Sequence, residues 1–279
     1  MGSNRPSWIG ILALVLLWQG ISAAGLVPPY MLPGPFQVGA AFVRDRSLLM
    51  GHLGHTLFEA AGGLLLAVAA AFLLALGMDA KPVLKAAVMP VLLLTQTVPA
   101  IALAPLLVLW LGYGVAPKIT LVFLTCFFPL TIGLLDGFAQ ADTDAIRLLQ
   151  SMGANRVQLY WYIKFPGALA AFFSGLKIAS AYSIVGAVIS EWLGGNAGLG
   201  VYMTRVRKSY SFDKMFAVIL LVAVLSLGLL KLVELLERRA MPWMAREALI
   251  YSIKNKSVLP LMWFFAVFRR KTRKTIGQR

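Results

Sequence analysis

Residues 142–166 form a polar segment, DTDAIRLLQSMGANRVQLYWYIKFP, between two long apolar segments. Asp142 and Asp144 can cap a helix or favourably charge its N-terminus, and Gly153 can end that helix because glycine tolerates positive φ. Pro166 suits the first turn of the long helix that follows. The spacing therefore predicts a helical hairpin that another protein could grip.

The second arm of this hairpin is predicted to be amphipathic. Val157, Tyr160 and Trp161 fall on one stripe of a short helix, with Arg156 and Lys164 beside them. Such a hairpin could lie in the headgroups of a membrane or dock onto a protein. Periodicity alone leaves the two interpretations equally good.

Catalytic and metal-binding groups are sparse in this chain. The one cysteine, Cys126, lies in an apolar run, which excludes a disulfide framework and a Cys/His metal cluster. His52 and His55 are better interpreted as interfacial side chains than as metal ligands. We therefore predict neither a metal site nor catalytic residues, and a membrane-embedded enzyme is a weak alternative.

Three charged residues lie within or at the ends of apolar segments. Glu59 is expected one turn inside the outer N-terminal end of its helix, where the helix dipole favours an anion. Lys177 is expected deep in its segment, either at a subunit interface or cavity or in a structural pair. Glu191 beside Trp192 is expected to anchor the membrane boundary, with outer gating as the alternative. The glycine-rich loop at 194–200 either contacts a partner or only allows tight turns.

The bilayer must be the main solvent of this chain, because 59% of its residues are hydrophobic, 13% are charged and its mean hydropathy is +0.80. The apolar runs are about 20 residues long without period-2 alternation, which favours helices over a barrel. We predict an all-α polytopic membrane protein with six spans, at residues 8–27, 56–78, 83–111, 119–135, 168–192 and 216–236. The first span is expected to be a retained anchor rather than a cleaved signal.

Three parts are predicted along the chain: an N-terminal anchor helix and outer loop at residues 1–55, a transmembrane core at 56–243 and a basic tail at 244–279. An excess of lysine and arginine in alternate loops, and above all in the tail, predicts that both termini are cytoplasmic. The net charge of +15 therefore indicates membrane topology and contact with anionic lipid, and nucleic-acid binding is not expected. Within the tail, residues 259–268 are too few to span and are expected to lie on the inner leaflet.

The third predicted span carries the best candidates for a pathway across the membrane. Prolines at positions 90, 99 and 105 are expected to break it, and Thr95, Gln96 and Thr97 place hydrogen-bonding groups near its middle. Each of the three taken alone is better explained by helix packing. As a group they are expected to line a pore, because polar side chains avoid lipid. Lys177 and Glu191 complete this predicted set.

The hairpin resembles the cytoplasmic loop signature of binding-protein-dependent ABC importer permeases, in which glycine, nine residues, isoleucine, any residue, leucine and proline follow one another. Gly153, Ile163 and Pro166 match this signature. Phe165 replaces its leucine, and Arg147 stands where the family has the glutamate of a Glu-Ala-Ala triplet. The resemblance implies that the hairpin couples to an ATPase through Asp144, Arg147, Gly153, Ala154, Arg156, Tyr160, Ile163 and Pro166.

The likeness covers residues 56–243, most clearly at 98–107, 110–114, 175–179, 186–188, 191–194 and 198–200. The stretches before residue 115 look like the branch that imports sulfonates, nitrate, riboflavin and pyrimidine precursors of thiamine. Those after Pro166 most resemble the permeases for hydroxymethylpyrimidine, a thiamine precursor, and taurine is a further cargo of the branch. A thiamine precursor is therefore the predicted cargo, and the others remain alternatives.

The resemblance implies the type I ABC importer fold in a bacterial inner membrane. It also implies a homodimeric pore, two ATP-binding cassette ATPase subunits and a periplasmic or lipid-anchored substrate-binding protein. The chain has no G-x-x-x-x-G-K-[ST] loop, so the partner must use the ATP, and we expect this chain to bind no cofactor. An ATP-independent channel is the remaining alternative to a permease.

Overall fold

The computed structural model describes residues 5–25, 27–28, 30–193 and 195–243. Every regular element within these residues is helical, which confirms the predicted all-α class. The chain divides into two compact units, residues 1–234 and 235–279. The predicted basic tail at 244–279 and Gly194 lie outside the described residues.

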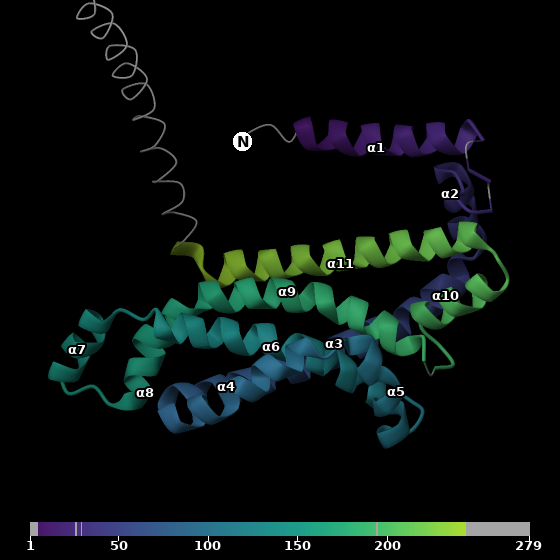
Figure 1. The fold of residues 1–279 in the computed structure, drawn as a ribbon. Helices are drawn as coiled ribbons and strands as arrows, with labels where there is room; N and C mark the ends of the chain where they lie inside the picture. The colour runs from purple at the N-terminus through teal and green to yellow at the C-terminus, as the bar shows by residue number, and fades with distance from the viewer. Residues whose placement is uncertain (1–4, 26, 29, 194, 244–279) are drawn as a thin grey trace, which may run out of the picture. The chain divides into compact units, whose positions relative to one another are not determined.

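Eleven α-helices and one π-helical turn make up the described residues (Figure 1). In chain order they are α1 (Arg5–Ala23), α2 (Pro35–Arg44), α3 (Arg46–Ala80), α4 (Pro82–Thr97), α5 (Ala100–Leu111), α6 (Ala116–Ala139), α7 (Thr143–Ser151), α8 (Arg156–Leu159), η1 (Tyr160–Lys164), α9 (Phe165–Glu191), α10 (Leu199–Lys208) and α11 (Phe212–Ala240).

Membrane-spanning length is reached by fewer helices than the six predicted. Among the described residues, four continuous helical segments are long and apolar enough to cross a bilayer: Arg46–Ala80, Ala116–Ala139, Arg156–Glu191 and Phe212–Ala240. The bent pair of α4 and α5 makes a fifth. The predicted first span contains only a shorter apolar stretch, Leu12–Ala23, so a sixth crossing is not confirmed.

Helices α3, α6 and α9 pack closely because small residues line their contacts. Ala67, Ala71 and Ala75 of α3 recur every four residues and are fully buried. Gly137 of α6 lies so near α9 that an added Cβ would be 2.6 Å from the Cα of Ala168. Apolar burial drives helix association little in lipid, so close backbone approach is what holds such a bundle together.

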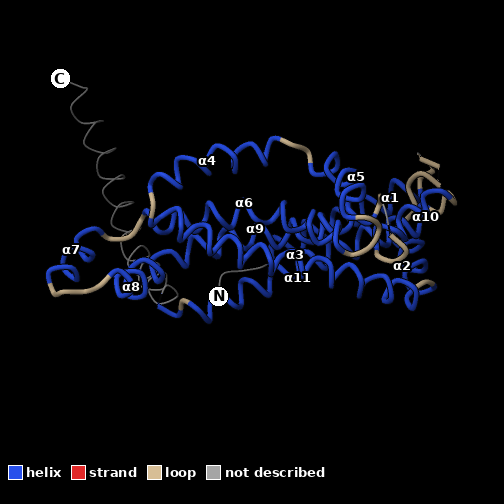
Figure 2. The backbone as a smooth tube through the Cα atoms, turned by 90° about the horizontal axis from the view of Figure 1, so that it is seen from below, coloured by secondary structure: helices blue, strands red, loops and turns tan. Residues whose placement is uncertain are grey.

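The predicted third span is broken rather than continuous. Helices α4 and α5 are bent by 102° around Val98 and Pro99, both of which have extended backbone (Figure 2). A proline disfavours helical backbone at the preceding residue, which explains the position of the break. Pro90 and Pro105 lie inside helices, so only one of the three prolines ends a helix as predicted.

The two ends of the bundle differ in character. Helices α7 and α8 project at one end, while α2 and α10 lie at the other (Figures 1 and 2). Helix α3 reaches from one end toward the other, and it begins at Arg46 rather than near residue 56. Glu59 therefore lies more than three turns inside its helix, and the predicted placement near a helix start is wrong.

Candidate functional site

The hairpin at 142–166 forms as the sequence predicts. The Asp142 side chain accepts hydrogen bonds from the backbone N–H groups of Asp144 and Ala145, at 2.9 and 3.3 Å. Gly153 has φ of +85°, the left-handed backbone that favours glycine after a helix. Asn155 then caps α8 in a reciprocal capping box with Gln158. The second arm differs from the predicted separate short helix, because α8 continues through the π-helical turn η1 into α9.

The hairpin presents an apolar surface that no described residue covers. Its exposed large side chains are Leu148, Met152, Val157, Trp161 and Tyr162. Exposed large apolar side chains along a polar projection are typical of a protein contact.

Arg147 and Arg156, two basic side chains of the hairpin, are also exposed. Arg147 forms an exposed pair with Asp144, 3.7 Å apart on the same helix. Ala154 and Ile163 are half-buried, and Pro166 lies in the first turn of α9. Arg147 is thus directed to its own helix, in the place where the family carries an acid.

The base of the hairpin is fastened to the end of α3. Both the hydroxyl of Tyr160 and the ammonium of Lys164 donate to the carboxylate of Asp79. The Lys164 ammonium also lies 4.8 Å from the centre of the Tyr160 ring, and Phe165 stacks on Phe72 of α3 with ring centres 5.1 Å apart. Tyr160 therefore leaves the predicted stripe and turns toward the bundle.

Asp79 was missed by sequence reasoning. An acid in the last turn of a helix is unfavourable to the helix dipole unless a cation or donor compensates it. The unfavourable position of Asp79 was the one sign in the sequence that it has a partner elsewhere in the fold. The partners lie more than 80 positions away in the chain, so the sequence did not reveal them.

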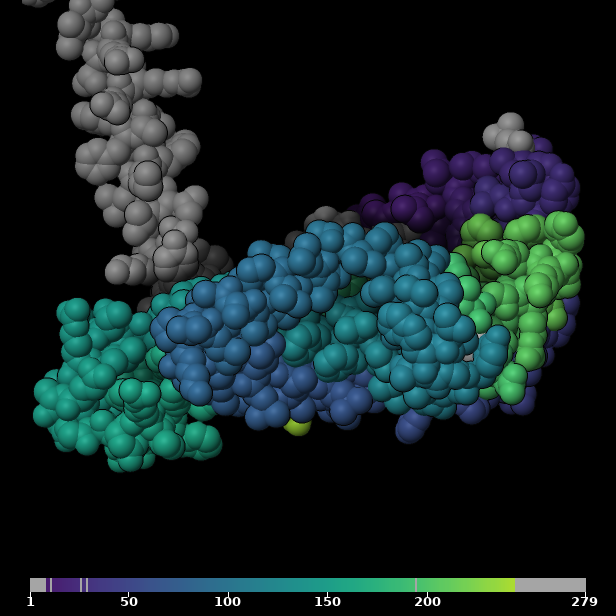
Figure 3. All heavy atoms as spheres, turned by 60° about the horizontal axis from the view of Figure 1, so that its bottom comes forward, coloured from purple at the N-terminus to yellow at the C-terminus, as the bar shows by residue number. Residues whose placement is uncertain are grey.

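A cavity of about 320 Å³ lies where α4 and α5 bend away from α6 and α9. Figure 3 shows this side of the molecule, with the blue atoms of α4 and α5 around a recess floored by teal atoms. The cavity is lined by Thr95, Gln96, Val98, Pro99, Ala100, Leu103, Leu121, Leu124, Thr125, Tyr182, Val185, Gly186 and Ile189. None of these residues carries a charge at neutral pH.

The predicted pathway residues are only partly brought together. Thr95 and Gln96 line this cavity. Thr97 does not, and its exposed hydroxyl donates to the Leu94 carbonyl at 2.8 Å. Lys177 is half-buried in α9 and does not line the cavity, while Glu191 lies at the α10 end of the bundle.

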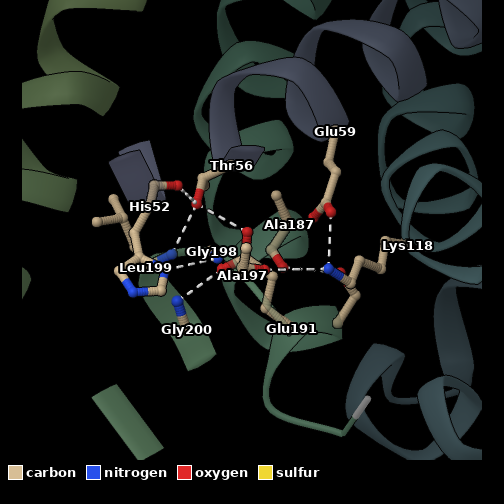
Figure 4. Close-up of polar contacts among 11 residues, drawn as sticks. His52, Thr56, Glu59, Lys118, Ala187, Glu191, Ala197, Gly198, Leu199 and Gly200 are labelled. Carbon is tan, nitrogen blue, oxygen red and sulfur yellow. Dashed lines mark hydrogen bonds and ion pairs between the residues drawn. The ribbon is translucent and has the colours of Figure 1, made fainter. Parts of the chain in front are cut away.

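Glu191 is the centre of a buried polar network that joins the loop before α10 to α3 (Figure 4). Its carboxylate accepts from the Thr56 hydroxyl at 2.7 Å and from the Gly200 N–H at 2.6 Å. The Thr56 oxygen in turn accepts from the Leu199 N–H at 2.9 Å. Glu191 is 1% exposed, so the prediction of an interfacial anchor is wrong.

The glycine loop before α10 folds tightly against this network. Gly198 has φ of +127° and donates its N–H to Nδ1 of the buried His52 at 2.9 Å. A Cβ at Gly198 would lie 2.1 Å from the Glu191 carboxyl carbon. The glycine is therefore required by both backbone conformation and space, and His52 is internal rather than interfacial.

A second ion pair lies beside the network. The Lys118 ammonium donates to Glu59 at 2.7 Å and to the Ala197 carbonyl at 3.3 Å, as Figure 4 shows. Both side chains of the pair are nearly inaccessible, so Glu59 lies inside the bundle. The pair forms one side of another cavity of about 340 Å³, which His55 and Tyr113 also line. Among the described residues no three His, Cys, Asp or Glu side chains gather to hold a metal ion.

A bent span beside an uncharged cavity, together with a capped hairpin that projects from the bundle, defines a membrane-embedded transport subunit. Residues 63–242 match the family described as "Binding-protein-dependent transport system inner membrane component". The chain belongs to this family, as the hairpin signature implied.

Three relatives are similar over most of their length. The chain is 35% identical to the formylaminopyrimidine transport permease protein ThiX of Halalkalibacterium halodurans, over 85% of this chain and 94% of the relative. It is 32% identical to the riboflavin transport system permease protein RibX of Chloroflexus aurantiacus, over 85% and 89%. It is 30% identical to the taurine transport system permease protein TauC of Escherichia coli, over 84% and 88%.

The fold is also found in a crystal structure of an amino acid ABC transporter with histidines. The TM-score is 0.60 at 16% identity, over 72% of this chain and 97% of the other. The chain therefore has the type I ABC importer transmembrane fold, in a multi-pass protein of the bacterial inner membrane. Its relatives are permease subunits rather than enzymes, and membership of the family implies an ATPase and a substrate-binding protein as partners.

Proposed function

We propose that two copies of this chain form the translocation pathway of an importer for hydroxymethylpyrimidine or a related thiamine precursor. Two partner ATPase subunits bind and hydrolyse the ATP, and this chain binds no cofactor. A periplasmic or lipid-anchored binding protein delivers the cargo, and both termini are cytoplasmic. The choice of cargo is supported by the similarity to a formylaminopyrimidine permease.

The observation that carries the proposal is the uncharged wall of the cavity at the helix break. A sulfonate or nitrate ion loses its hydration on entering such a cavity, and without a cationic side chain that loss is poorly compensated. An aminopyrimidine is neutral, flat and able to accept and donate hydrogen bonds. It therefore suits a wall of apolar side chains interrupted by a few hydroxyl and amide groups.

Taurine is the second candidate, and one feature favours it. The first residue of α5, Ala100, lines the same cavity, and the N-terminus of a helix attracts anions. Taurine permeases also occur among the relatives.

Uptake into proteoliposomes separates these functions. The permease is reconstituted with its ATPase and binding protein, and uptake of radiolabelled hydroxymethylpyrimidine and of radiolabelled taurine is measured with and without ATP. We expect ATP-dependent uptake of the pyrimidine. Full-rate flux without the ATPase would instead identify a channel, and uptake of taurine alone would refute the proposed cargo.

Coupling through the hairpin is tested by Gly153→Pro. Proline requires φ near about −65° and cannot adopt the observed +85°. The connection between α7 and α8 must therefore take another backbone conformation, which changes the angle between the two helices. We expect ATP hydrolysis to continue while transport falls at least about tenfold, a loss equal to about 1.4 kcal/mol of coupling. Gly153→Ala, which is strained but not excluded, should have a smaller effect.

Charge reversal at Arg156 tests the same surface without touching the backbone. Arg156→Glu should also lower the ratio of transport to hydrolysis, since an exposed side chain on the hairpin is available to a partner. Normal uptake in both Gly153→Pro and Arg156→Glu would show that the hairpin does not couple.

A further inference from the structure

Gln96 stands out among the side chains around the cavity at the helix break. It is exposed on the cavity wall, and its amide makes no hydrogen bond within the described part of the chain. The hydroxyl hydrogens of Thr95 and Thr125 are already donated to their own helices, at the Leu92 and Val122 carbonyls. Gln96 and the phenol of Tyr182 are thus the lining side chains that retain a donor and an acceptor, and of these two only the Gln96 amide presents them as separate, adjacent groups.

The position of Gln96 makes this free amide significant. It is the penultimate residue of α4, in the middle of the bent span rather than at either end of it. A polar side chain at that depth is unfavourable against lipid, so it should face water, cargo or protein. The cavity beside it supplies such a space.

The rest of the wall sets the shape and polarity of an occupant. Leucine, valine, isoleucine, alanine and proline side chains make up most of it, and Tyr182 adds a half-exposed aromatic ring. The volume of about 320 Å³ is at the small end of the range for ligand sites, which suits one ring but not a large cofactor.

We propose that this cavity is a cargo-binding site for a single neutral aminopyrimidine ring, and that the Gln96 amide recognises it. An aminopyrimidine presents a ring nitrogen acceptor next to an exocyclic amino donor. A glutamine amide presents the matching donor and acceptor, and the same two-bond pairing lets glutamine recognise adenine at its N6 and N7 atoms. The proposal rests on the proposed function and adds the residue that selects the cargo.

Selection by Gln96 follows from the cost of unpaired polar groups. In an apolar cavity, a ring without the amino group would leave the amide oxygen of Gln96 without a donor. The site should therefore discriminate against such an analogue more strongly than its lost contact area suggests.

The test is a comparison of two ligands on two proteins. The complete permease with its ATPase is placed in lipid nanodiscs, and binding of hydroxymethylpyrimidine and of its analogue lacking the 4-amino group is measured for wild type and Gln96→Leu. We expect wild type to prefer the amino compound by about tenfold, as for one two-bond pair, and Gln96→Leu to lose that preference. Gln140→Leu, at an exposed glutamine that does not line the cavity, is the matched control and should behave as wild type.

Retention of the preference in Gln96→Leu would overturn the proposal, as would absence of pyrimidine binding to wild type. Uptake of hydroxymethylpyrimidine that is insensitive to Gln96→Leu would refute this site while leaving the proposed function intact. Binding of taurine at the cavity, together with uptake of taurine and not of the pyrimidine, would refute both.

Discussion

Glu59 and Lys118 show how single residues make buried charge tolerable in this bundle. The ammonium of Lys118 neutralises Glu59 and also donates a hydrogen bond to the backbone carbonyl of Ala197. One oxygen of Glu59 is buried without a hydrogen-bond partner among the described residues. Lys118 is thus the cation on which the local charge balance depends.

Lys118→Met should destabilise the protein by about 3–5 kcal/mol, because it leaves the Glu59 carboxylate buried without its cation. Thermal unfolding in detergent is the measurement. Adding Glu59→Leu to this variant should recover much of the loss, since an apolar pair needs no charge compensation.

A matched control exists for this pair. Lys231 and Glu234 are also 2.7 Å apart, but the lysine side chain is 71% exposed compared with 6% for Lys118. Lys231→Met should therefore cost at most about 1 kcal/mol. Equal shifts in the two lysine variants would show that burial does not control the contribution of the pair.

Helix α3 connects the two ends of the bundle. Its 35 residues extend about 52 Å at 1.5 Å per residue, more than the thickness of about 30 Å of a hydrocarbon core. Its last turn holds Asp79 under the hairpin, and its first half holds Thr56 and Glu59 in the polar contacts at the other end. One continuous helix, without an intervening loop, therefore joins the base of the hairpin to the polar contacts at the other end.

Asp79→Asn should weaken the connection between hairpin and α3, because a charged acceptor of two hydrogen bonds becomes neutral. Bonds to charged groups contribute about 1.5–3 kcal/mol each. We expect ATP hydrolysis to continue and the number of cargo molecules transported per ATP to fall, measured in proteoliposomes.

Two further variants serve as comparisons for Asp79→Asn. Tyr160→Phe keeps the ring and removes one of the two donors, so its effect should be smaller. Asp136→Asn, at an exposed acid on α6, should have no effect. An unchanged transport ratio in Asp79→Asn would show that the connection is only structural.

A second junction lies at the start of α3, where Asp45 joins three helices. Its carboxylate accepts from the Tyr202 hydroxyl of α10 at 2.6 Å and from the Lys214 ammonium of α11 at 2.7 Å. The hydrogen bond from Lys214 lowers the pKa of Asp45 below its ordinary 3.8. Burial raises the pKa of Tyr202, so this hydroxyl remains a donor.

Stability at this junction should depend on acid pH. Because the folded-state pKa of Asp45 is depressed, its contribution is complete above about pH 3.8 and is lost as the pH falls through the folded value. Wild type should unfold at a higher temperature than Asp45→Asn at pH 7, and the difference should shrink toward pH 3. A difference independent of pH would contradict this assignment.

For the whole molecule, much of the fold was predictable from hydropathy and local signals. The hairpin was predicted correctly because its caps, glycine and proline act within a few residues of themselves. The number of spans and the start of α3 were less accurate, because hydropathy averages over windows and overlooks polar residues that tertiary contacts cover. His52 and Thr56 are two such residues.

The residues of the candidate site likewise include some that the sequence indicated and some that it did not. Thr95 and Gln96 line a cavity, as polar residues near prolines in an apolar span suggest, and their place in a translocation pathway stays a prediction. Asp79 and Lys118 were not chosen, because their partners lie 85 and 59 positions away along the chain.

By itself, the sequence determined that this is a helical membrane protein with a capped hairpin, because composition, period and capping depend on neighbouring residues, and the signature of that hairpin resembles the one in ABC importer permeases. Only the tertiary structure decided that Glu59, Lys118 and Glu191 are internal and that one cavity is free of charge. The physical reason is that hydrogen bonds and ion pairs depend on distances in space, and the packing of α3, α6 and α9 sets those distances.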